Sequence, residues 1–196
     1  MAREILLAEN YSGLTMDALA SALGMSKKTL YIHFASKDAI VSAIIDATGR
    51  TVRRQAEAAM AQWTADFTSV LRTVLGIISI NVAVLTPGFM ADIERFAPHL
   101  AREIEALKDR NIPAVFGRLI ELGIANGKVR RDVDVRFVVE FLLQTMKSLH
   151  QTESLNRSGL TMQAAFEKAL DLFLIGLLSP EGRAEYDPAV KPRTTE

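Results

Sequence analysis

The residues of this 196-residue chain whose types and spacing suit binding chemistry lie between positions 15 and 37. Three lysines, Lys27, Lys28 and Lys37, stand there without any aspartate or glutamate from position 18 to position 37, so the local charge is 3 − 0 = +3. Hydroxyl, phenol and imidazole groups lie between them. Such donors suit the phosphate oxygens and base edges of DNA. The alternative interpretation is a set of lysines that only solubilises an exposed face.

The surrounding residues have the spacing of a helix-turn-helix. We expect helices at 16–23 and 27–34, with Gly24 ending the first in the left-handed conformation and Ser26 capping the second. Ala20 is small where the helices would cross. The side chains expected to pack inward are Leu19, Leu23, Met25, Leu30 and Phe34. This geometry places the polar side chains of the second helix outward, which favours DNA binding over a solubilising function.

The same segment resembles the amino-terminal domain of TetR-family transcriptional regulators. The matching stretches are Thr15-Met16 through Ala20, Gly24-Met25-Ser26, Thr29-Leu30-Tyr31, His33-Phe34 and Ser36-Lys37-Asp38. Asn10 stands where the family often has glycine, and asparagine tolerates a left-handed helix end. Family members commonly carry a basic extension before the first helix. This chain has only Arg3 there, which indicates a truncated or misassigned start, or fewer phosphate contacts.

The resemblance implies a set of DNA contacts. Thr15 and Lys37, at helix starts, would bind backbone phosphate, and Tyr31 and His33 would contact phosphate at the groove edge. The second helix would present its first residues to the major groove of a double-stranded operator. The full set is Thr15, Ser26, Lys27, Lys28, Thr29, Tyr31, His33 and Lys37.

The elements that position these residues are predicted to be helical, because apolar residues recur at three- and four-residue spacing and alternating strand-like runs are missing. We predict an all-α fold, with an N-terminal three-helix helix-turn-helix domain at 1–46, a larger helical ligand-binding and dimerisation domain at 47–179, and a mobile tail at 180–196. Further helices are expected at 3–9, from 37 toward 60, and at 66–85, 98–126, 135–153 and 161–178. Gly88 marks a break, and Pro113 should kink or split its helix.

Composition excludes several functional classes. The chain has no cysteine, which excludes disulfides, thiolate zinc sites and cysteine nucleophiles. A net charge of zero with 49% hydrophobic residues excludes a disordered protein. No apolar run reaches the length of a membrane span or a signal peptide, so cytoplasmic residence is expected. Phosphate-loop, nucleophile-elbow and His-Glu-x-x-His motifs are missing, so we expect no enzyme, cofactor or metal site.

The resemblance also implies a small-molecule site in the larger domain. The candidates are large apolar side chains and one histidine: Trp63, Phe67, Phe89, Met90, Phe96, Phe116, Phe141, Met146 and His150. Ordinary core packing is the alternative, since aromatic and methionine residues at helical spacing commonly form the core. His99 and His150, near glutamates, would bind a polar ligand group or be structural histidines.

The helices expected at 135–153 and 161–178 are apolar on more than one face, which predicts burial within the subunit or against a second copy. The candidates for a homodimer interface are Phe141, Phe166, Leu170, Phe173, Leu174 and Leu177. A two-fold pairing would place two recognition helices in successive major grooves, about 34–36 Å apart.

These expectations describe a ligand-responsive DNA-binding transcriptional regulator, a repressor released from a palindromic operator by a small molecule. Two alternatives stay open: a helical adaptor, or a small-molecule-binding enzyme, with a vestigial helix-turn-helix.

Overall fold

The computed structural model of the chain describes residues 10–61, 67–82, 85–149 and 159–186, and every regular element in these ranges is a helix. The elements are the 3-10 turn η1 (Tyr11–Gly13) and the helices α2 (Met16–Ala22), α3 (Lys27–His33), α4 (Lys37–Ala61), α5 (Phe67–Val82), α6 (Pro87–Phe96), α7 (Pro98–Ala125), α8 (Val135–Leu149), α10 (Met162–Leu177) and α11 (Pro180–Glu185). The prediction of an all-α fold is therefore confirmed. The helix expected at 3–9 lies outside the described residues.

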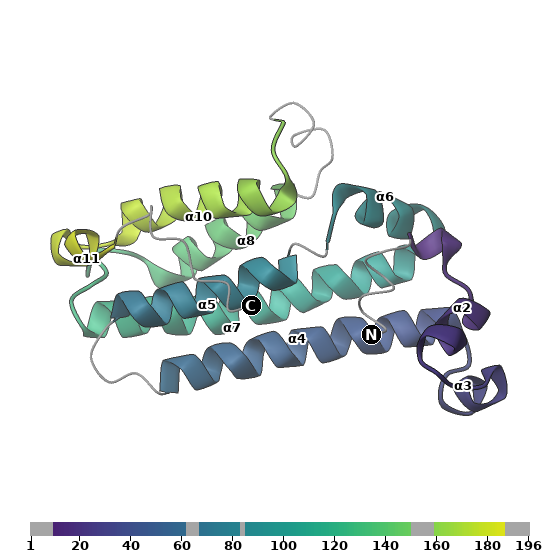
Figure 1. The fold of residues 1–196 in the computed structure, drawn as a ribbon. Coiled ribbons are helices and arrows are strands. Elements are labelled where there is room, and N and C mark those ends of the chain that lie inside the picture. Colours follow the sequence, from purple (N-terminus) through teal and green to yellow (C-terminus); the bar gives the residue numbers. More distant parts are fainter. Residues whose placement is uncertain (1–9, 62–66, 83–84, 150–158, 187–196) are drawn as a thin grey trace.

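The long helices α4, α5 and α7 run side by side, with η1, α2 and α3 at one end and α11 at the other (Figure 1). Helices α4 and α7 approach closely because Gly49 has no side chain. A Cβ atom there would lie 2.1 Å from the Leu107 side chain. The Asn111 amide donates a hydrogen bond of 2.9 Å to the Gly49 carbonyl, which fixes the register of the two helices.

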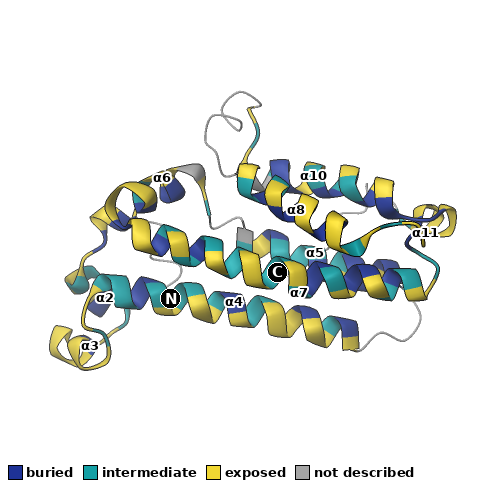
Figure 2. Ribbon diagram, turned by 180° about the vertical axis from the view of Figure 1, so that it is seen from behind, coloured by how far each residue is buried: buried dark blue, intermediate teal, exposed yellow. Residues whose placement is uncertain are grey.

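The buried side chains form three clusters along the inner faces of the helices (Figure 2). One cluster joins α4, α5, α7, α8 and α10, and a second, smaller one joins α7, α8 and α10. The third joins the helix-turn-helix to α6 and the start of α7. The boundary predicted at 46/47 therefore falls inside one continuous helix, α4, and the core of the amino-terminal domain includes residues far along the chain.

Four local expectations need correction. Gly88 does not mark a break, because it lies in the first turn of α6, which Thr86 caps by accepting the Phe89 amide. Pro113 lies inside the continuous helix α7 and does not split it. Asn10 has φ −64° and ψ 153°, which is extended and not left-handed. Met25 is not packed inward but is 36% exposed.

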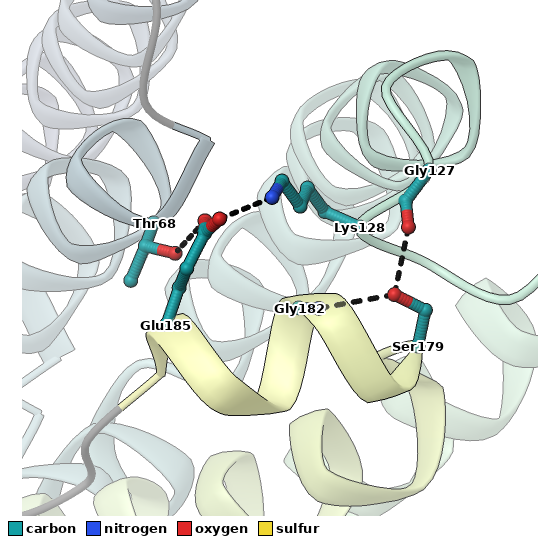
Figure 3. A network of polar contacts seen from close by, with 6 residues as sticks. All are labelled: Thr68, Gly127, Lys128, Ser179, Gly182 and Glu185. Carbon is teal, nitrogen blue, oxygen red and sulfur yellow. Dashed lines mark hydrogen bonds and ion pairs between the residues drawn. The ribbon is translucent and has the colours of Figure 1, made fainter.

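The mobile tail expected at 180–196 begins instead with a helix, α11. The Ser179 hydroxyl donates to the Gly127 carbonyl and accepts the Gly182 amide, at 2.7 and 3.0 Å (Figure 3). Lys128 pairs with Glu185. The polar sequence indicated a mobile segment, whereas polar contacts with Gly127 and Lys128, just after α7, hold α11 and its capping residue in place. Residues 187–196 lie outside the described part.

Among the described helices, none combines the length and the apolar character that a bilayer crossing requires.

Candidate nucleic-acid interface

Helices α2 and α3 are set by caps and by one left-handed glycine. Thr15 accepts the Ala18 amide at 3.1 Å, and Ser26 accepts the Thr29 amide at 3.0 Å. Gly24 has φ +64°, a conformation that disfavours a side chain, so the predicted turn and the predicted Ser26 cap are both present. Leu19 and Leu30 are fully buried beneath the two helices. This packing leaves most of α3 outside the core.

Helix α3 buries only Leu30, and its other six residues are exposed (Figure 2). Six members of the predicted contact set lie on α3 or directly before it, and all six are exposed: Ser26, Lys27, Lys28, Thr29, Tyr31 and His33. Thr15 is exposed at the start of α2, and Lys37 is partly buried at the start of α4. A short helix projecting from a domain in this way has the shape that a major groove admits.

The three lysines differ in their partners. Lys27 forms an exposed ion pair of 2.9 Å with Asp17 on α2, and this hydrogen bond raises the pKa of the ammonium group. Lys37 donates to the Tyr11 carbonyl at 3.1 Å and lies 4.2 Å from the centre of the Tyr11 ring. Within the described part of the chain, Lys28 has no such partner. Lys28 is therefore the cation most available to a ligand, while Lys37 also holds η1 against α4.

Polar contacts join the helix-turn-helix to the larger part of the chain. The Asp38 carboxylate accepts the Tyr11 hydroxyl at 2.5 Å and lies 3.0 Å from Nε2 of His99. The Asp92 carboxylate on α6 accepts the Ser12 amide at 2.6 Å. His99 is thus in contact with Asp38, which favours the structural interpretation of this histidine. These contacts connect α6 and the start of α7 to the amino-terminal part of the chain.

The described residues predicted to line an effector site belong to different clusters. Phe89 and Met90 on α6 pack in the helix-turn-helix cluster, whereas Phe116 and Met146 belong to the cluster of α7, α8 and α10. Phe67 is buried near Gly123 at the far end of α7.

Four predicted pocket residues remain. Phe96 and Phe141 are 53% and 54% exposed, and Trp63 and His150 lie outside the described residues. Within the described residues, a cleft of about 470 Å³ lies between α4 and α7, and none of the nine candidate pocket residues lines it. Its lining residues include Ser42, Asp46, Glu103 and Arg110.

The residues predicted for a dimer interface divide into two groups. Phe166, Leu170, Leu174 and Leu177 are buried in the subunit's own core because they face α5, α7 and α8. Phe141 faces outward, and its ring stacks between Phe137 and Phe173 with centroid distances of 6.3 and 6.2 Å. The exposed apolar side chains of α8 and α10, hereafter the α8/α10 patch, are Phe137, Phe141, Leu172 and Ile175.

Several surface side chains escaped prediction from the sequence. Phe137, Leu172 and Ile175 were not among the interface candidates, because both helices are apolar on more than one face and only packing shows which side faces solvent. Asp17 was missed because it lies just before the segment without acids. Ile32, 73% exposed on α3, was passed over as apolar. Its signal was available, since it stands four residues after Lys28 and therefore on the same face.

No group of three or more histidine, aspartate or glutamate side chains suited to a metal ion occurs within the described ranges.

Comparison with known proteins identifies the fold and the amino-terminal domain. Residues 1–44 match the family model described as bacterial regulatory proteins, tetR family. Comparison with curated proteins gave no match. A TetR-family transcriptional regulator from Agrobacterium tumefaciens is similar in structure, with TM-score 0.64, 17% identity, and coverage of 91% of this chain and 94% of that chain.

Two further solved structures have the same fold. The TetR-family regulator PfmR from Thermus thermophilus has TM-score 0.55 and 23% identity, with coverage of 89% of this chain and 94% of that chain. FadR from Bacillus subtilis, solved in complex with stearoyl-CoA, has TM-score 0.60 and 18% identity, with coverage of 89% and 95%. Residues 1–44 of this chain therefore match the model of the tetR family of bacterial regulatory proteins, and the chain as a whole has the fold of those regulators.

Proposed function

We propose that this protein is a ligand-responsive transcriptional repressor of the cytoplasm that binds a palindromic DNA operator and leaves it when a small molecule binds. The observation that carries the proposal is α3, a capped helix with six exposed residues and, within the described chain, a lysine without a partner. In this proposal Thr15, Tyr31 and His33 contact the phosphate backbone of the operator. Phosphate contacts by such lysines supply salt-dependent affinity, and groups on the outer face of the helix supply base recognition.

Binding to a palindrome requires two copies, and the α8/α10 patch supports a homodimer. Its exposed aromatic and aliphatic side chains come from two adjacent helices, and the Phe141 ring stacks on Phe137 of α8 and on the partly buried Phe173 of α10. An exposed apolar patch of this kind marks an interaction site. Two-fold pairing of α8 and α10 would bury it in a four-helix interface and would place one α3 helix at each half-site.

Release by a small molecule is supported by the position of α6. Phe89, Met90 and Ile93 on this helix are buried in the same cluster as Leu19 and Leu30 of the helix-turn-helix. A ligand that prefers a shifted α6 would therefore move the DNA-facing end and lower affinity by a shift of population. FadR of Bacillus subtilis was solved with stearoyl-CoA. For this chain we propose only the class, a small organic effector bound among the helices of the larger part.

Selection of duplexes by the purified full-length protein from a random DNA pool tests the proposal. We expect enrichment of an inverted repeat, with an apparent affinity that falls steeply between 50 and 200 mM salt, by about 10³-fold or more for six to ten phosphate contacts. A library of metabolites is then tested for release of the selected duplex. Failure to enrich any duplex would favour a helical adaptor, and turnover of a bound compound would favour an enzyme.

A further inference from the structure

One side chain of α3 does not fit the polar character of its surroundings. Ile32 is 73% exposed, whereas Leu30, two residues earlier, is 1% exposed. The rest of the exposed helix surface is hydroxyl, cationic or amphipathic: Lys27, Lys28, Thr29, Tyr31 and His33. A single exposed isoleucine is ordinary on a protein surface. Its place on a short helix that projects toward a proposed partner is the feature that requires explanation.

The helical period places Ile32 at the tip of α3. Successive residues turn by about 100°, so Lys28 and Ile32 lie about 160° from Leu30, one on each side. They are the two residues farthest from the buried one, and both are exposed. Lys27 and His33 lie nearer the core, at about 60° from Leu30. A groove that receives α3 would therefore meet Lys28 and Ile32 first.

The chemistry of the major groove leaves one apolar group for such a side chain. Guanine, cytosine and adenine present hydrogen-bond donors and acceptors at their groove edges, and thymine adds a 5-methyl group. An isoleucine placed over a G·C pair would remove water from polar atoms without supplying a hydrogen bond, which costs free energy. Over a thymine it would bury hydrocarbon against hydrocarbon. The β-branched side chain is also stiff in a helix, so little conformational freedom is lost on contact.

We propose that Ile32 is a specificity-determining residue that packs against the 5-methyl group of one thymine in each half-site of the operator. The inference rests on the proposed function, because it requires α3 to enter the major groove. The occupant is duplex DNA, since Lys28 beside Ile32 supplies the cation that a phosphate-lined groove attracts.

The test uses the duplex selected by the full-length protein. Each thymine in a half-site is replaced in turn by deoxyuridine, which differs only in lacking the 5-methyl group, and dissociation constants are measured by fluorescence anisotropy. For the unmodified protein we expect one thymine whose replacement weakens binding about fourfold per half-site, the value of one buried methyl-sized group. For Ile32→Ala the same replacement should change affinity by less than about 1.5-fold, because the side chain that senses the methyl group is gone.

Matched variants separate this effect from general damage. Ile80→Ala removes an isoleucine that is 57% exposed on α5 and should keep the full deoxyuridine effect. Ile32→Val keeps a β-branched side chain and should retain part of it. Thermal unfolding of Ile32→Ala should match that of the unmodified protein, since the side chain is exposed.

Two results overturn the proposal while the proposed function stands: every deoxyuridine duplex binds as well as the parent, or the loss persists in Ile32→Ala. A protein that enriches no duplex overturns both.

Discussion

The division of the predicted dimer residues into outward and inward side chains gives a sharp test, with Phe141→Ser and Leu174→Ala as the pair of variants. Phe141 is 54% exposed in the α8/α10 patch, whereas Leu174 is 6% exposed in the subunit core. Both side chains are apolar, and each lies on one of the two helices proposed to pair, Phe141 on α8 and Leu174 on α10. If the patch is the dimer interface, Phe141→Ser weakens association and Leu174→Ala weakens the fold.

The magnitudes follow from the exposed areas. A phenylalanine presents about 200 Å², so its exposed half leaves ~110 Å² for a partner, and at ~25 cal/mol per Å² this area contributes ~2.7 kcal/mol. The two-fold axis counts each change twice, giving an upper limit of ~5 kcal/mol, or more than three decades in the dimer dissociation constant. Within the subunit, Phe141→Ser removes the stacking of Phe141 on Phe137 and on Phe173, which costs only ~1 kcal/mol per ring pair. Leu174→Ala should instead lower the free energy of unfolding by ~2–5 kcal/mol.

Sedimentation equilibrium over a range of protein concentrations measures association, and urea unfolding at one fixed concentration measures stability. We expect the unmodified protein and Leu174→Ala to sediment as dimers at micromolar concentration, and Phe141→Ser to sediment as a folded monomer. The reasoning is refuted if Phe141→Ser keeps the parental dissociation constant. It is also refuted if the unmodified protein is a monomer that binds the palindrome tightly.

Three further predictions follow from the described contacts. Burial, and then the hydrogen bond to Asp171, raise the pKa of Tyr186 in the folded protein. The contribution of this phenol to stability is therefore complete below about pH 10 and is lost as the pH rises above that value. Urea unfolding at alkaline pH should show that the free energy of unfolding declines less steeply for Tyr186→Phe than for the parent. In Gly182→Ala the new Cβ would lie 2.1 Å from the Lys128 carbonyl oxygen, so thermal unfolding should reveal a loss of ~1–3 kcal/mol, whereas Gly176→Ala, with open space around it, should be neutral or stabilising. Lys28→Ala should lower the log–log salt slope of operator binding by about 0.9 per half-site, and Arg118→Ala on α7 should leave the slope unchanged; equal slopes for all three proteins would remove Lys28 from the phosphate contacts.

The sequence alone determined local structure wherever a residue type strongly prefers one backbone conformation or one capping position. Gly24 adopts the left-handed conformation, and Ser26 caps α3, because these preferences act within a single turn. Helical periodicity predicted α4, α5, α7, α8 and α10 to within a few residues at the ends that the structure describes. The motif from Thr15 to Lys37 also predicted the family, since its residues satisfy one compact geometry.

The larger arrangement required the tertiary structure, because it depends on which face of each helix a distant segment covers. Helices α8 and α10 are apolar on more than one face, so only packing separated the buried Leu174 from the exposed Phe141. Phe89 and Met90, candidates for an effector site, pack on the helix-turn-helix, about 60 residues away in sequence from Leu30, and no local pattern indicated this contact. Lys37 and Lys28 are the same residue type and lie in the same motif, so the sequence does not distinguish them. The structure alone gave Lys37 a carbonyl and an aromatic ring as partners and left Lys28 without one in the described chain, because contacts between residues far apart in sequence leave no local pattern.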